Sequence, residues 1–244
     1  MTRKGRVGFE LLLGQVLDAL PPAPAAVVDA GGGTGQLAVA LAGHGYRVTV
    51  VDTSAAMLAT CAQRAADEGG EVAERVTGVQ GDAAVLPGLL GEGSQDAAVC
   101  HDLLTRVDDQ AALVASLAGV LAEGGVLSLG FANRDWLALR AGRRGDHADA
   151  VRLVESGGDR GSEAVTLTEA EQLLDKAGLA LAAAYGVGVF AEVGDDDLNR
   201  EELAALVELE RRVAGREPYR SSARTLHLIA RRRVFRPDLT GYTP

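Results

Sequence analysis

The sequence predicts an α/β protein: a doubly wound, mostly parallel seven-stranded sheet with a helix at its N-terminus and an insertion after the fifth strand. Short apolar runs of strand length alternate along the chain with segments whose apolar residues recur at helical spacing. The runs are apolar at nearly every position, which is typical of parallel strands buried on both faces. A chain of 244 residues is long enough to bury such a sheet in one domain.

The N-terminal segment predicts an amphipathic helix rather than an export signal. Charged and polar residues interrupt its apolar run, and the apolar residues return at helical spacing. These residues are Phe9, Leu12, Leu13, Val16 and Leu20. A proline-containing linker, Pro21–Pro24, follows, so residues 1–24 are expected to precede the sheet.

The alternation predicts where the remaining elements lie. Strands are expected over residues 26–28, 47–51, 76–79, 97–100, 126–131, 179–185 and 225–230. Helices are expected over residues 37–41, 55–66, 111–121, 136–141, 169–177 and 201–213. Residues 134–163 break the alternation with six Arg among Asp and Gly. We expect them to form an insertion over the active site, within a single domain that spans residues 1–244.

Composition points to the cytoplasm. No segment approaches the ~18–20 apolar residues of a membrane span, so no membrane association is expected. Cys61 and Cys100 are the only cysteines, which makes no disulfide framework and suits a reducing cytosol. His44, His147 and His227 show no metal-ligand spacing, so no metal is expected.

Charge is distributed unevenly along the chain. The net charge of −10 argues mildly against non-specific binding of nucleic acid. Between Arg211 and Arg236, however, there are nine Arg and a single acid, Glu217. Such a basic segment can capture a polyanion. It can equally be a solvated surface, because Lys4 and Lys176 are the only lysines and Arg is the usual cation of this chain.

A glycine-rich segment, Asp29 to Gly35, follows the first predicted strand and precedes a helix. Glycines at this place let the backbone pass close to a ligand, and the helix N-terminus favours a carboxylate or phosphate. A dinucleotide fingerprint would need glycine at position 36, where the sequence has Gln36. The segment therefore predicts a ligand other than a dinucleotide.

Acidic residues end the next two predicted strands. Asp52 is suited to accept hydrogen bonds from two ribose hydroxyls, and Asp82 to meet the edge of an adenine. Open α/β sheets bind ligands at this edge of the sheet. Alternatively, Asp52 caps the helix that follows it, with Ser54 in the same role.

His101 and Asp102 follow the fourth predicted strand. A histidine there can take part in the chemistry, contact a cofactor, or simply pack. The sequence contains neither a nucleophile elbow nor a zinc-binding HExxH motif.

With these motifs in place, the chain resembles class I S-adenosylmethionine-dependent methyltransferases, whose fold is Rossmann-like. More narrowly, it is similar to the bacterial tRNA 5-carboxymethoxyuridine methyltransferase family, along nearly the whole chain. The matching positions are Lys4-Gly5, Asp29 to Gln36, His101, Gly124 to Leu129, Asn133, Gly186 to Phe190, Leu206 to Glu210, Glu217-Pro218-Tyr219, Arg224 and His227. The late segments are the specific ones, since the first half would match many methyltransferases.

The resemblance implies S-adenosyl-L-methionine as the cofactor and assigns residues to it. With the motifs above, the expected cofactor-binding residues are Arg6, Gly31, Gly32, Gly33, Gly35, Asp52, Thr53, Asp82, Ala83, Ala84 and His101. His101 and Arg224 are the candidate catalytic residues. Two departures stand out: Gly8 replaces a family arginine, for which Arg6 is the candidate substitute, and Thr105-Arg106 replaces a Glu-Trp pair.

An anionic methyl acceptor fits this set of residues. A carboxylate is already ionised near neutral pH and needs no general base, so positioning can supply most of the rate. Cations would hold it, and the candidates are Arg106, Arg134, Arg220 and Arg224. Arg224 is preferred because the family pattern also has it.

Three hypotheses of function remain open at this point. The first is a tRNA methyltransferase that esterifies the carboxylate of wobble 5-carboxymethoxyuridine. The second is the same chemistry on a small carboxylate metabolite, which the negative net charge favours. The third is a cofactor-binding protein without catalysis.

Overall fold

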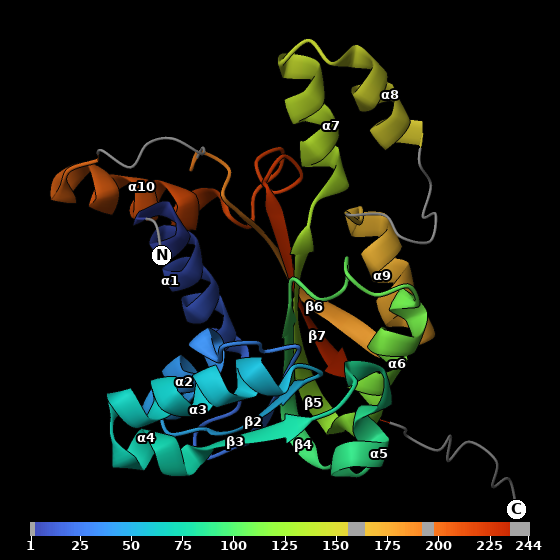
Figure 1. Ribbon diagram of the computed structural model, residues 1–244. Coiled ribbons are helices and arrows are strands. Elements are labelled where there is room, and N and C mark those ends of the chain that lie inside the picture. The colour runs from blue at the N-terminus through green and yellow to red at the C-terminus, as the bar shows by residue number, and fades with distance from the viewer. Residues whose placement is uncertain (1–2, 156–163, 192–197, 235–244) are drawn as a thin grey trace, which may run out of the picture.

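The structure, a computed structural model, describes residues 3–155, 164–191 and 198–234, with side chains from Val7 onward. Within these residues, seven strands form one sheet in the order β3-β2-β1-β4-β5-β7-β6 (Figure 1). The strands are β1 (Ala26–Ala30), β2 (Arg47–Asp52), β3 (Val76–Gln80), β4 (Gln95–His101), β5 (Leu121–Ala132), β6 (Leu179–Val187) and β7 (Thr225–Arg232). Strand β7 is antiparallel to both neighbours, and the other pairs are parallel. The predicted fold class is confirmed.

Helices cover both faces of this sheet. They are α1 (Arg3–Ala19), α2 (Gln36–Gly43), α3 (Ala55–Glu68), α4 (Gly70–Arg75), α5 (Leu86–Leu90), α6 (Gln110–Val120), α7 (Arg134–Arg143), α8 (His147–Glu155), α9 (Leu167–Lys176) and α10 (Arg200–Val213), with a short 3-10 turn, η1 (Ala83–Val85). In Figure 1, α1 to α4 lie on one side of the sheet and α5, α6 and α9 on the other. Two apolar cores follow from this, one on each face. None of the described helices is long and apolar enough to cross a membrane.

Small side chains and leucines build the cores, as the scarcity of aromatic residues requires. The core under α6 and α9 is made mainly of Leu, Val and Ala, with Phe131 as its one aromatic side chain among the described residues. The core under α1, α2 and α3 has a similar composition around Tyr46. Burying such side chains is the main source of folding free energy, at about 25 cal/mol per Å² of apolar surface.

The structure differs from the expected elements in three places. Strand β5 begins at Leu121 rather than at residue 126, because the Gly124-Gly125 turn forms an irregularity within the strand, opposite Gln95 to Ala97. The short helices α4 and α5 were not expected, since segments of five or six residues carry too little periodicity. The insertion contains two helices, α7 and α8, where only residues 136–141 were expected to be helical.

The strand order places a ligand crevice at the carboxyl ends of β1 and β4. Strands β2 and β3 follow β1 on one side, whereas β4 and β5 lie on the other. The helices that leave β1 and β4 therefore diverge to opposite faces, and ligands of open α/β sheets bind where the strand order reverses in this way. Helix α7, which leaves β5 at this same edge, projects beyond the sheet (Figure 1).

Candidate functional site

The glycine loop after β1 is tightly packed except at one position. A Cβ at Gly31 would lie 2.8 Å from Leu103, and one at Gly35 would lie 2.1 Å from the Sγ of Cys61. Both glycines have positive φ, as Gly33 does. At Gly33, by contrast, a Cβ would meet nothing within 4 Å. The loop therefore presents bare backbone to open space at Gly33 while its other glycines are held against the protein.

Gly32 packs directly against the carboxyl of Asp29. A Cβ at this position would lie 2.6 Å from the carboxyl of Asp29. Asp29 is 4% exposed, and burial raises its pKa to about 7, with the nearby charge of Asp52 acting in the same direction and a backbone hydrogen bond from Ala38 opposing it. This acid supports the loop from within the core, and it was not among the expected binding residues.

Asp52 joins the glycine loop to β2. Its Oδ2 accepts a hydrogen bond from the backbone N–H of Gly33 at 3.0 Å, and its Oδ1 accepts one from the N–H of Ser54 at 2.8 Å. The cap of α3 is Ser54, whose hydroxyl accepts from the N–H of Met57. The alternative that Asp52 caps this helix is therefore wrong. Each carboxylate oxygen retains a lone pair for a ligand hydroxyl.

The expected adenine-binding segment lies beside Asp52. Asp82 comes two residues after the end of β3, and its Oδ1 accepts from the N–H of Ala84 at 2.9 Å, which caps η1. Ala83 is buried, and the N–H of Gly81 donates to the carbonyl of Asp52. Thr53, exposed between Asp52 and Ser54, accepts from the side chain of Gln80. The structure thus brings these residues together at the ends of β2 and β3.

His101, the last residue of β4, is bound to the sheet through Ser128. The Nε2 of His101 lies 2.8 Å from the hydroxyl of Ser128, which in turn lies 2.7 Å from the Nε2 of His227. Burial lowers the pKa of His101 to about 4, so the ring is neutral near pH 7. Its Nδ1 is buried without a hydrogen-bond partner among the described residues.

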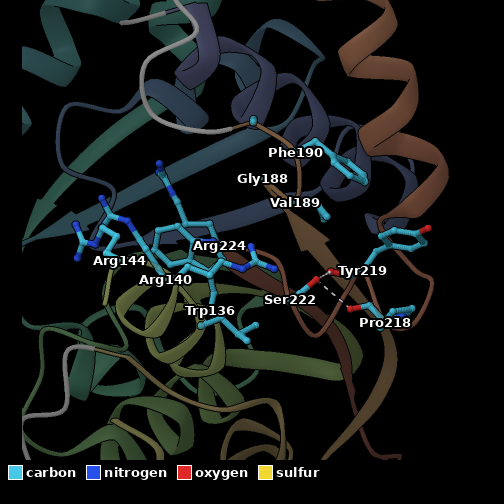
Figure 2. A pocket seen from close by; sticks show the side chains of 13 residues that line it. Trp136, Arg140, Arg144, Gly188, Val189, Phe190, Pro218, Tyr219, Ser222 and Arg224 are labelled. Atoms are coloured by element: carbon cyan, nitrogen blue, oxygen red, sulfur yellow. Dashed lines mark hydrogen bonds between the residues drawn. The ribbon is translucent and has the colours of Figure 1, made fainter. Parts of the chain in front are cut away.

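Arg224 lines a pocket whose other side is formed by the insertion. This pocket, of about 700 Å³, lies between α7, the segment after β6 and the loop before β7 (Figure 2). It is lined by Trp136, Leu139, Arg140, Arg143, Arg144, Gly188, Val189, Phe190, Ala191, Pro218, Tyr219, Ser222 and Arg224. The guanidinium of Arg140 lies 5.2 Å from the centre of the Trp136 ring, and the rings of Phe190 and Tyr219 are 5.8 Å apart.

Two of the arginines expected to hold an acceptor are paired with acids of the protein. Arg134 is 4% exposed, forms an ion pair with Glu169 at 2.8 Å and donates to the carbonyl of Ala164. It ties the start of α7 to α9, so its selection as an acceptor cation was wrong. Arg220 forms an ion pair with Glu217 at 2.6 Å.

Asn133 and Glu210 shape the pocket, and neither was expected to have a function. The side-chain amide of Asn133 donates to the carbonyls of Ser221 and Ala223, both at 2.8 Å, while its oxygen caps α7. The fully buried carboxylate of Glu210 accepts from three consecutive backbone N–H groups, those of residues 189 to 191. Both residues fall in segments that the family resemblance marked, but no local pattern in the sequence indicates a physical role for either of them.

Some predicted site residues are not described. The side chain of Arg6 lies outside the described residues, although its backbone belongs to α1. Residues 156–163 of the expected insertion are also outside them. Among the residues that are described, no group of three or more His, Cys, Asp or Glu could hold a metal ion.

Comparison with known proteins assigns the chain to a family. A family model for a methyltransferase domain matches residues 28–129. The tRNA 5-carboxymethoxyuridine methyltransferase of Escherichia coli K12 is 31% identical over 243 residues, covering 95% of this chain and 90% of the relative. The chain belongs to the class I S-adenosylmethionine-dependent methyltransferases. The resemblance expected from the sequence is thus confirmed.

Two further proteins resemble this chain, one in sequence and the other in fold. The ubiquinone biosynthesis O-methyltransferase of Xanthomonas axonopodis pv. citri is 31% identical over 168 residues, 69% of this chain and 68% of the relative. A solved methyltransferase from Methanosarcina mazei superposes with a TM-score of 0.64 at 19% identity, covering 91% of this chain and 98% of that one. This second likeness shows the fold alone.

The residues of the crevice fit the cofactor of this methyltransferase. Gly33 offers open backbone, Asp52 offers carboxylate lone pairs beside it, and the segment from Asp82 to Ala84 lies at the next strand end. On the other side of β1, the Nδ1 of His101 is a buried polar atom with no hydrogen-bond partner in the described part of the chain. S-adenosylmethionine, when bound, supplies a methyl group on a positively charged sulfur.

Proposed function

We propose that this methyltransferase esterifies the carboxylate of a modified wobble uridine, 5-carboxymethoxyuridine, in tRNA. The observation that carries the proposal is the pocket that combines three aromatic side chains with four arginines, next to the end of β5. The relative that matches 95% of this chain is itself described as a tRNA 5-carboxymethoxyuridine methyltransferase, which supports the same substrate.

The chemistry of the pocket favours an anionic nucleotide over a small acid. Trp136, Phe190 and Tyr219 offer ring faces, and bases splayed out of RNA are commonly bound by stacking on such rings. Arg140, held over Trp136, adds a cationic plane. A volume of about 700 Å³ accommodates a nucleotide, whereas a small carboxylate would leave most of it unfilled.

In this proposal, the enzyme acts by holding an acceptor that is already reactive. The acceptor carboxylate is ionised at neutral pH, so no residue has to remove a proton. Arg224 holds the carboxylate with paired, charge-assisted hydrogen bonds and fixes its approach. Positioning of this kind accounts for much of the rate of a bimolecular displacement. Near pH 7 the neutral ring of His101 adds no positive charge to that of the cofactor.

The substitution Arg224→Lys tests the role of Arg224. Lysine keeps the charge but loses the planar pair of donors, so we expect kcat/KM for carboxymethoxyuridine-containing tRNA to fall roughly 10- to 100-fold. The affinity for S-adenosylhomocysteine, measured by calorimetry, should stay within about twofold. Arg47→Lys is the matched control, because Arg47 begins β2 and so lies at the end of that strand away from Asp52 and the crevice. Equal turnover by Arg224→Lys and the parent would remove Arg224 from the acceptor site.

The acceptor itself is identified by mass spectrometry of nucleosides from cells with and without this protein. The methyl ester of 5-carboxymethoxyuridine should disappear in its absence. If the tRNA nucleosides are unchanged, a small carboxylate metabolite becomes the leading acceptor. The net charge of −10 favours that second candidate, because an acidic protein attracts RNA only through a local basic surface.

A further inference from the structure

A line of four hydrogen-bonded side chains runs through the sheet from the N-terminal helix to the end of β4. The Oε1 of Gln15, on α1, lies 2.7 Å from the Nδ1 of His227 on β7. The Nε2 of His227 lies 2.7 Å from the hydroxyl of Ser128 on β5, which lies 2.8 Å from the Nε2 of His101. Ser128 and His227 are fully buried. Four elements, α1, β7, β5 and β4, thus contribute one side chain each to a continuous line of hydrogen bonds.

The order of donors and acceptors along this line follows from the amide oxygen at its start. The Oε1 of Gln15 can only accept, so the Nδ1 of His227 carries the proton. Burial and the neighbouring His101 lower the pKa of His227, so its ring is neutral and its Nε2 accepts from the hydroxyl of Ser128. That hydroxyl has one proton, so it must accept from the Nε2 of His101. The Nδ1 of His101 is left with a lone pair.

The sheet fixes the ring that carries this lone pair. His101 pairs with Gly130, which pairs with His227, so the two histidines lie on either side of a glycine. A Cβ at Gly130 would lie 3.0 Å from the Cδ2 of His101, which means that the ring occupies the space that the glycine leaves. The two imidazole rings meet edge to face, with their centres 5.4 Å apart.

We propose that Gln15, His227 and Ser128 are positioning residues, which keep the Nδ1 of His101 unprotonated as an acceptor for the ammonium group of the bound cofactor. Asp52 and Asp82, on the β2 and β3 side of β1, suit the donors of the nucleoside half. The remaining donor of S-adenosylmethionine is its ammonium group, and β4 lies on the other side of β1. A lone pair attracts this cation, whereas an N–H group would repel it. The inference concerns the cofactor, and so does not depend on the identity of the methyl acceptor.

The tautomer can be read directly in the ligand-free protein. Nitrogen-15 NMR of histidine-labelled protein distinguishes a protonated from an unprotonated ring nitrogen. We expect the parent and Gln15→Glu to show the His101 ring protonated at Nε2, because a carboxylate also accepts from His227. In Gln15→Met, the sulfur is only a weak acceptor for the Nδ1 of His227, so the His227 ring is no longer held in one tautomer. The His101 ring should then appear as a mixture of its two tautomers. A parent ring protonated at Nδ1 would overturn the proposal.

Calorimetry with two ligands tests the consequence for binding. The probes are S-adenosylhomocysteine and its analogue without the amino group. Ser128→Ala should weaken S-adenosylhomocysteine by on the order of tenfold, the loss expected for one charge-assisted hydrogen bond, and should barely change the analogue. Ser116→Ala is the matched control, since it removes another buried serine hydroxyl, one that accepts from the N–H of Leu86.

A general loss of packing would give a different pattern. If Ser128→Ala weakened both ligands equally, or neither, the line would be a structural feature of the sheet only. Gln15 is partly exposed, so its variants remain informative if Ser128→Ala does not fold. Among them, Gln15→Met, like Ser128→Ala, should lose much of the preference for S-adenosylhomocysteine over the analogue without the amino group. Gln15→Glu should keep the preference of the parent. Loss of the selectivity in Gln15→Glu would contradict the proposed direction.

Discussion

Asp52 holds two backbone N–H groups and also faces the crevice, so its substitution separates binding from folding. We expect Asp52→Ala to reduce the affinity for S-adenosylhomocysteine by on the order of 1.5–3 kcal/mol for each ribose hydrogen bond lost. Ser54→Ala removes the cap of α3, at a cost of about 1 kcal/mol in stability, and should leave affinity unchanged. Calorimetry and denaturant unfolding measure the two quantities. If Asp52→Ala, like Ser54→Ala, lowers stability but leaves the affinity unchanged, Asp52 only anchors the glycine loop and does not bind the ligand.

Asp29 makes the stability of the ligand-free protein depend on pH. Its pKa is raised to about 7 in the folded state from 3.8, because its carboxyl is buried. Between these values the folded state keeps a proton that the unfolded state releases, so the carboxyl contributes full stability below about pH 4 and loses it as pH rises towards 7. The loss approaches roughly 1.4 kcal/mol per pH unit.

Asp29→Asn removes this titration. The free energy of unfolding of Asp29→Asn, measured by urea denaturation, should therefore gain on that of the parent as pH rises from about 5 to about 7. Equal slopes for the two proteins in this window would mean that the carboxyl is not protonated in the folded state.

At the scale of the elements, Glu210 attaches α10 to the segment that lines the pocket. Its buried carboxylate accepts from the N–H groups of residues 189 to 191, so that removing it leaves these three backbone donors without their acceptor. We expect Glu210→Ala to cost on the order of 3 kcal/mol in stability and to raise the KM for the acceptor, while affinity for S-adenosylhomocysteine is kept. Glu208→Ala, on the solvent face of the same helix, should affect neither. An unchanged acceptor KM in Glu210→Ala would show that the segment does not shape the site.

At the scale of the whole molecule, an acidic protein would meet an acidic RNA through one basic region. Arg143 and Arg144 are exposed at the end of α7, where they line one side of the pocket. If they contact phosphates, replacing both with Gln should lower the slope of log affinity for tRNA against log salt by about two. Filter binding over a range of salt concentrations measures this slope. The exposed pair Arg211 and Arg212, bound to Glu208, is the control, and an equal effect there would indicate non-specific attraction.

The sequence alone determined the fold class and predicted the glycine loop and the acids at the strand ends, because these features depend on local patterns. Periodicity distinguishes strand from helix, and a glycine loop followed by acids at successive strand ends is contained in short segments. Asp52 illustrates the limit. Its place at the end of β2 was predictable, but only the structure distinguished a loop anchor from a helix cap, since the N–H of Gly33 lies 19 residues away.

Tertiary structure decided which polar side chains act together. Arg134 and Arg224 have the same side chain and both were candidates, yet burial against Glu169 gives Arg134 a structural role, while Arg224 lines the pocket. Gln15 and His227 are 212 residues apart, and Ser128 and His227 are 99 apart. No local pattern encodes such pairs. They exist because β7 lies between β5 and β6 and because α1 packs on one face of this sheet. The burial of apolar surface over the whole chain fixes both arrangements.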